Sequence, residues 1–141
     1  KADLWFVIDG ANVCLDRQNT HGQGFLANLK IMRKRLETLG LSTYDILCDR
    51  SLRHKIDEPL LYKRMSKRGE LIETPADTEA DYFILNRAKA KDAFIISNDR
   101  FRDHYENFGK KWVRSRRISF TFIEEEIYFD GIFRHVEPKI E

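Results

Sequence analysis

The sequence lacks the features that mark membrane-spanning, disulfide-rich and zinc-binding proteins. It has no run of about 18 uncharged apolar residues, so no segment is expected to cross a membrane. Its two cysteines, Cys14 and Cys48, have no CxxC or Cys/His spacing, and the histidines show no ligand spacing. Two cysteines without such spacing are typical of an intracellular protein, so we predict a location in the cytoplasm, with the nucleus as the alternative. The sequence also leaves a single disulfide bond as an alternative to two free thiols.

An excess of charge of one sign is also lacking. The 25 Lys and Arg residues nearly balance the 23 Asp and Glu residues, and a net charge of +2 alone indicates neither nucleic acid nor membrane as a partner. The 42% hydrophobic and 12% aromatic content of the 141 residues is typical of a folded core and excludes a mainly disordered chain. We predict a single domain over residues 1–141, with a core at about 4–129 and a tail at about 131–141.

Strand-like and helix-like segments alternate along the chain. Leu4–Ile8 is a continuous apolar run, typical of a strand covered on both faces, and Phe25–Leu39 has apolar residues at helical spacing before Gly40. A later helix is expected to be capped by Asp77 or Thr78. Further strands are predicted at 43–48, 71–73, 93–96, 118–123 and 127–129, and further helices at 58–67 and 101–108. This alternation predicts an α/β fold with a mostly parallel sheet of about five strands joined by right-handed crossovers.

Acidic residues follow two of the predicted strands. The first strand ends in Asp9 with Asn12 close behind, and the strand at 93–96 is followed by Ser97 and Asp99. In an open parallel sheet the carboxyl ends of the strands form the ligand-binding edge, so these acids are expected to converge there. Clustered carboxylates repel one another unless a cation joins them, and Mg²⁺ or Mn²⁺ takes oxygen ligands of this kind. The candidate acids are Asp9, Asp81, Asp99 and Asp103.

Basic residues surround the predicted acidic crevice. Such a rim is needed by a nuclease, because an acidic crevice alone would repel a polyanion. Each feature also has an ordinary interpretation, since an Asp after a strand often caps a helix and Arg-rich faces are usually solvated surface. The convergence of several acids is what favours a functional site. The rim residues are Arg53, Lys55, Arg100 and Arg102.

Three segments together resemble a known family. They are VIDGANV at residues 7–13, DYFI at residues 81–84 and IISNDRFRD at residues 95–103. They are similar to the NYN branch of PIN-like ribonucleases, most of all to the Regnase (MCPIP) type, and the order and approximate spacing agree from about residue 4 to 129. The resemblance implies a PIN-like three-layer α/β/α sandwich. It also implies Mg²⁺- or Mn²⁺-dependent endonucleolytic cleavage of single-stranded RNA.

The resemblance also implies roles for individual residues. The chain departs from the family pattern at Ala80-Asp81, where Regnase-type domains carry adjacent aspartates, so one acid is missing or is replaced by Glu79 at a different helical angle. The basic insertion that the family carries before the helix with Asp81 is also absent. A homo-oligomer and additional domains in a longer parent chain are further alternatives that the sequence leaves open. The implied metal ligands are Asp9, Asp81, Asp99 and Asp103, with Asn12 as a further catalytic residue and Ser97 beside them. Arg53 falls where Regnase-type domains place an arginine that contacts the substrate. Together with the basic rim, this gives the expected RNA contacts Arg53, Lys55, Ser97, Arg100 and Arg102.

Three other functions make different demands on the same residues. An inactive NYN domain that binds RNA without cutting it would keep the basic rim but lose an essential acid, whereas all four matched acids are present here. A phosphatase of the haloacid dehalogenase type carries a second acid two residues after the first, where this chain has Ala11. A dinucleotide-binding domain needs GxGxxG after the first strand, which Gly10-Ala11-Asn12 does not provide.

Overall fold

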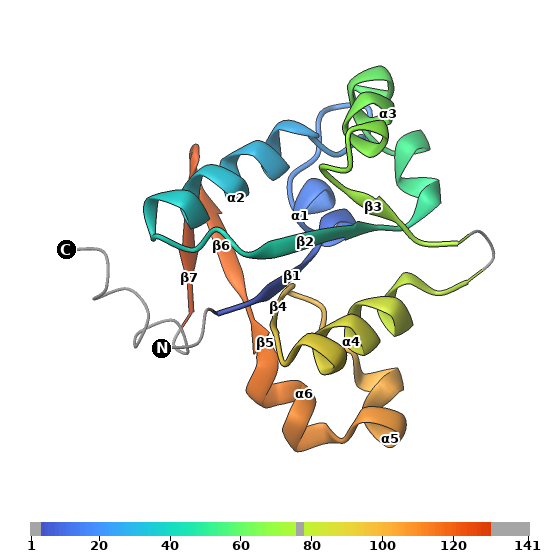
Figure 1. The fold of residues 1–141 in the computed structure, drawn as a ribbon. Helices are drawn as coiled ribbons and strands as arrows, with labels where there is room; N and C mark the ends of the chain where they lie inside the picture. The colour runs from blue at the N-terminus through green and yellow to red at the C-terminus, as the bar shows by residue number, and fades with distance from the viewer. Residues whose placement is uncertain (1–3, 76–77, 131–141) are drawn as a thin grey trace.

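A parallel sheet of five strands, in the order β3-β2-β1-β4-β5, forms the centre of the protein (Figure 1). The structure is a computed structural model that describes residues 4–75 and 78–130. Each neighbouring pair of strands runs parallel, which confirms the predicted α/β class. The strands are β1 (Phe6–Asp9), β2 (Tyr44–Cys48), β3 (Ile72–Glu73), β4 (Phe94–Ile96) and β5 (Arg117–Ile118).

The strand order reverses between β1 and β4. From β1 the chain adds β2 and β3 on one side, and then crosses to add β4 and β5 on the other side. The register pairs Ile8 with Ile96, so Asp9 at the end of β1 lies level with Ser97 after β4. Such a reversal is the switch point at which open α/β sheets bind ligands.

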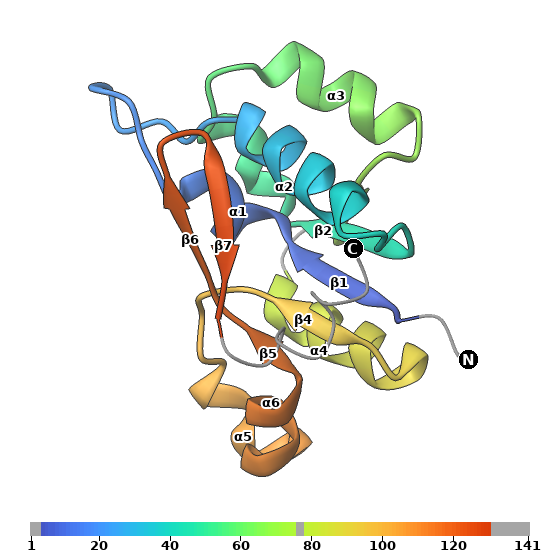
Figure 2. The ribbon, with the colours of Figure 1, turned by 90° about the vertical axis from the view of Figure 1, so that its left-hand side faces the viewer.

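Helices cover both faces of the sheet, so the three-layer arrangement is confirmed (Figures 1 and 2). The two faces are covered by different helices because the chain crosses the sheet after β3. One face carries α1 (Gly10–Leu15), α2 (Ala27–Thr38) and α3 (Pro59–Lys67), and the other carries α4 (Ala80–Lys91), α5 (Tyr105–Phe108) and α6 (Lys110–Arg116). The 3₁₀ helices η1 (Arg50–His54) and η2 (Arg102–His104) follow β2 and β4. Among the described residues, none of the helices is both long and apolar enough to cross a membrane.

The continuous apolar run of β1 is explained by burial on both faces. Phe6 and Ile8 belong to the core cluster under α2, whereas Val7 belongs to the cluster under α4, and all three are fully buried. Successive side chains of a strand point to opposite faces, so a strand between two helical layers needs apolar residues at every position.

The C-terminal strands differ from the prediction. Instead of one strand at 118–123, β5 ends at Ile118, and β6 (Phe120–Ile123) forms an antiparallel hairpin with β7 (Glu126–Phe129). Figure 2 shows this hairpin standing beside α2, outside the parallel sheet. The predicted tail at 131–141 lies outside the described residues.

Several helices also differ from the prediction. The helix predicted at 101–108 is η2 followed by α5, and α1 and α6 were not predicted. α4 begins after Glu79 with no side-chain cap, because the Thr78 hydroxyl donates to the carbonyl of Pro75 instead. The alternative cap, Asp77, lies outside the described residues.

Candidate active site

Asp9 is a buried carboxylate at the end of β1. Its Oδ1 accepts the backbone N–H of Asn12 at 3.2 Å, which caps α1, and its Oδ2 accepts the hydroxyl of Ser97 at 2.8 Å. Only 6% of the residue is exposed. Burial raises the pKa of Asp9 from 3.8 to about 6 against the lowering effect of these hydrogen bonds, and nearby Asp99 adds to the rise. A carboxylate in this position is stabilised by a proton or by a bound cation.

Asp81 and Asp99 face the same hollow as Asp9. Burial, followed by repulsion from Asp99, Asp9 and Glu79, raises the pKa of Asp81 from 3.8 to about 7. The predicted convergence of these acids is therefore present at the switch point of the sheet. They line a hollow of about 460 Å³ together with Ala11, Asn12, Leu15 and Asp16.

Asp103 lies on one side of this hollow. An adjoining hollow of about 500 Å³ is lined by Asp103, Asp81 and Asp99, so Asp103 faces the Asp81–Asp99 side of the site. The turn between Asp99 and Asp103 depends on Phe101, whose φ of 55° is in the left-handed region and costs about 1–3 kcal/mol. Phe101 is 1% exposed, so the burial of its ring offsets this strain and fixes the turn.

Sequence reasoning missed Asp16, which lies at the end of α1. Asp16 is four residues after Asn12, a spacing that places both on one face of a helix, and both line the hollow. The spacing could have revealed Asp16 if α1 had been predicted.

Glu79 and His104 are also near the acids. His104 Nε2 lies 3.1 Å from Glu79 Oε1, and one ligand atom from each of Glu79, Asp81 and His104 lies within 4.8 Å of the others. His104 is buried and directly follows Asp103 in the chain, which is the sequence signal that could have suggested it.

Three of the four predicted basic residues line hollows beside the acids. Lys55 lines a hollow of about 200 Å³ beside Asp9 and Asp81, and the exposed Arg100 and Arg102 line the hollow of Asp103. These three residues therefore line two different hollows that share Asp81.

The side chains of Arg53 and Ser97 are bound to other residues of the protein. Arg53 Nη2 is bound to Glu73 Oε1 at 2.6 Å, in an ion pair whose side chains are 23% and 16% exposed. Ser97 is fully buried, and its hydroxyl donates to Asp9 and accepts the backbone N–H of Asp99 at 3.0 Å. The structure therefore gives Ser97 no exposed surface for RNA, and places it as a support for Asp9 instead.

The donor set fits a divalent cation. The described residues that line the Asp9 hollow include no basic side chain, so nothing in that lining neutralises its four carboxylates, those of Asp9, Asp16, Asp81 and Asp99. Carboxylate oxygens are the ligands that Mg²⁺ and Mn²⁺ take in proteins. The imidazole of His104 beside Asp81 favours a transition metal over Mg²⁺ on that side of the site.

Comparisons with known proteins agree with this geometry. Two solved structures of nuclear proteinaceous RNase P 2 (PRORP2) from Arabidopsis thaliana are similar, with TM-scores of 0.71 and 0.70 and 25% sequence identity each. They match 90% and 92% of this chain, whereas this chain spans 29% and 30% of theirs. A comparison with curated proteins returns no match.

A family model described as the Zc3h12a-like ribonuclease NYN domain matches residues 4–141. This match confirms the resemblance to NYN ribonucleases, and it covers nearly the whole chain. The protein therefore belongs to the family of Zc3h12a-like ribonuclease NYN domains.

Proposed function

We propose that this chain is a metal-dependent endoribonuclease that cleaves single-stranded RNA. The observation that carries the proposal is the convergence of Asp9, Asp81 and Asp99 on one hollow at the switch point of the sheet. Mg²⁺ or Mn²⁺ would be held by these acids, with Asp103 on the adjoining side. When bound, such an ion supplies positive charge for a developing phosphoryl oxyanion and makes a coordinated water more acidic.

The chain's own residues would orient the substrate and the acids. Ser97 holds one oxygen of Asp9, which leaves the carboxylate fixed at the end of β1. Asn12 Oδ1 accepts the backbone N–H of Asn98 at 2.7 Å, so the group that Asn12 can offer to a phosphate is its amide N–H. Lys55 on one side, with Arg100 and Arg102 on the other, would attract consecutive phosphates of a strand crossing the hollow.

A second candidate function is RNA binding without cleavage. Ala80 lines the hollow beside Asp9 and Asp81, at the position where Regnase-type domains carry an acid, so the site has one carboxylate fewer. The activity of whole RNase P is not carried over, because this chain spans less than a third of those proteins. A homo-oligomer, additional domains and an intracellular location stay predictions.

Labelled single-stranded RNA incubated with the purified chain distinguishes the two functions. We expect internal cleavage with Mn²⁺, weaker cleavage with Mg²⁺ and none with EDTA, because the acids and His104 would bind Mn²⁺ more tightly. RNA that is retained in a gel shift but never cut with either ion would favour the binding module. Cleavage that persists in EDTA would contradict a metal-dependent site.

The basic rim makes a separate prediction about affinity. Arg100→Ala should weaken binding of a non-cleavable single-stranded RNA and lower the slope of log affinity against log salt by about one unit. Arg53→Ala removes the same charge, but Arg53 is already bound to Glu73, so it serves as the matched control with a smaller change in slope. Fluorescence titrations at several salt concentrations measure both slopes. Equal slopes for Arg100→Ala and the parent would place Arg100 outside the path of the RNA.

A further inference from the structure

Asn98, between Ser97 and Asp99, joins three parts of the fold. Its backbone N–H donates to Asn12 Oδ1 on α1 at 2.7 Å. Its side-chain Oδ1 accepts the backbone N–H of Phe120 at 2.9 Å, and its Nδ2 donates to the carbonyl of Phe120 at 3.0 Å and to Asp16 Oδ1 at 3.3 Å. One residue therefore ties the loop after β4 to α1 and to the first residue of β6.

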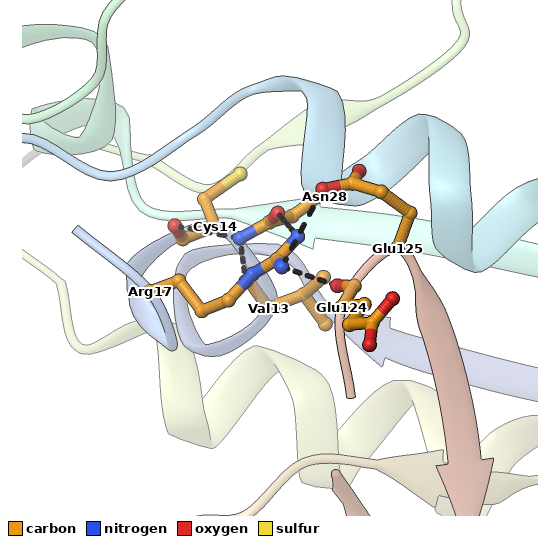
Figure 3. Close-up of polar contacts among 6 residues, drawn as sticks. All are labelled: Val13, Cys14, Arg17, Asn28, Glu124 and Glu125. Atoms are coloured by element: carbon orange, nitrogen blue, oxygen red, sulfur yellow. Dashed lines mark hydrogen bonds and ion pairs between the residues drawn. The ribbon is translucent and has the colours of Figure 1, made fainter. Parts of the chain in front are cut away.

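Arg17 joins the other end of the hairpin to the same helix (Figure 3). Its Nη1 donates to the carbonyl of Glu124 in the hairpin turn, and its Nη2 donates to Asn28 Oδ1 at 3.0 Å. Asn28 in turn donates to the carbonyls of Val13 and Cys14 on α1, at 3.1 and 3.3 Å. The Arg17 guanidinium also lies 4.4 Å from the ring centre of Phe122.

The hairpin therefore bridges the two walls of the acidic hollow. One wall is α1 with Asn12, together with Asp16 directly after it, and the other is the loop that carries Asp99. α1 has only six residues, and a helix of that length is not stable without tertiary support. Metal ligands need positions fixed to within about 0.5 Å, so a support of this kind has direct consequences for the site.

We propose that Asn98 is a positioning residue, and that the β6–β7 hairpin, acting through Asn98 and Arg17, sets the distance between α1 and the Asp99 loop. The role in cation binding rests on the proposed function, whereas the mechanical role rests on the contacts alone. The hairpin is thereby part of the functional site without any of its side chains lining the Asp9 hollow.

The first test measures Mn²⁺ binding to the RNA-free protein by electron paramagnetic resonance. Asn98→Ala should weaken Mn²⁺ binding about tenfold, the lower end of what loss of an outer support of a metal site costs. Arg17→Met should weaken it less, because Arg17 acts from the far end of the hairpin. Asn19→Ala is the matched control, since Asn19 Oδ1 accepts the backbone N–H groups of His21 and Gln23 at 2.9 and 3.0 Å away from the hollow. This control should leave Mn²⁺ binding unchanged.

The second test needs no metal. Amide hydrogen exchange of the metal-free protein should become faster in α1 and at residues 97–99 in Asn98→Ala, and not in Asn19→Ala. If the parent binds no Mn²⁺, the proposed function fails, and this exchange difference still decides the positioning role. Mn²⁺ binding and exchange that are the same in Asn98→Ala and Asn19→Ala would overturn the inference.

Discussion

Replacing Asp9 with asparagine is expected to reduce metal-dependent RNA cleavage by more than about 100-fold, because loss of an outer support alone already costs about 10- to 100-fold. Asp9 lines the acidic hollow and is 6% exposed, and its two carboxylate oxygens are held in place by hydrogen bonds from Asn12 and Ser97. Asparagine keeps an oxygen that can accept from Asn12 or Ser97, so the fold should remain intact.

The same substitution should make the metal-free protein more stable at neutral pH. In the folded protein the pKa of Asp9 is raised from 3.8 to about 6 and that of Asp81 from 3.8 to about 7. At a pH between 3.8 and the raised pKa, the folded protein therefore holds a proton on each of these carboxyls that the unfolded chain has already released. The free energy of unfolding of the parent therefore falls as the pH rises from about 4 to about 7. Asp9→Asn removes the part due to Asp9, so it should gain on the order of 1–3 kcal/mol at pH 8 and nothing near pH 3.

Urea unfolding in EDTA at several pH values, together with cleavage assays, measures both effects. Asp45→Asn is the control, because Asp45 is bound to Arg87 at 2.9 Å near the amino end of β2 and is not among the residues that line the hollow. This control should retain cleavage and should not gain stability. An Asp9→Asn protein that unfolds at a lower urea concentration than the parent at pH 8 and still cuts RNA would show that Asp9 is structural.

Gly10→Ala is expected to destabilise the protein by about 2–3 kcal/mol, the cost of forcing extra volume into a packed core. A Cβ atom at Gly10 would lie 2.4 Å from Cys48 Sγ and 3.0 Å from the carbonyl oxygen of Leu47. Cys48 is fully buried on β2, so it has little room to move. Glycine is therefore what allows α1 to begin directly against the sheet, where it can be capped by Asp9.

The clash with Cys48 can be tested by a double-mutant cycle. Cys48→Ala alone should destabilise the protein by opening a small cavity, and the double variant Gly10→Ala/Cys48→Ala should lose less stability than the sum of the two single variants. Urea midpoints of the four proteins give the coupling energy. A Gly10→Ala protein as stable as the parent would mean that α1 moves away from β2 without cost.

The central part of the fold and site could be predicted because its signals are local. The apolar run of β1 ends in Asp9, the short run of β4 is followed three residues later by Asp99, and the rule for parallel sheets brings those strand ends together. Asp9 and Asp99 follow from these two facts alone. α1 could not be predicted, because Gly10, Asn12 and Val13 are poor helix formers and the helix is held by capping and by its neighbours.

The other corrections arise from contacts between distant residues. Residues 118–123 have a continuous strand pattern, yet the chain leaves the sheet after Ile118, and Asn98 binds both backbone groups of Phe120 across 22 positions. Arg53 is basic and follows β2 as predicted, but its partner Glu73 is 20 residues away. Sequence periodicity contains no information about such pairs.

The acidic hollow is assembled from segments that are synthesised far apart in time. The hydrogen bond between Ser97 and Asp9 joins residues 88 positions apart, and the one between Asn98 and Asn12 joins residues 86 positions apart. At translation rates of about 5–20 residues per second, roughly 5 to 20 seconds separate the emergence of the two walls. Of the four predicted acids, only Asp9 and Asp81 precede β4 in the chain. A growing chain on the ribosome therefore lacks the other two at the site until β4 pairs with β1. The proposed cutting activity would therefore begin only after that late pairing, once Asp99 and Asp103 have emerged.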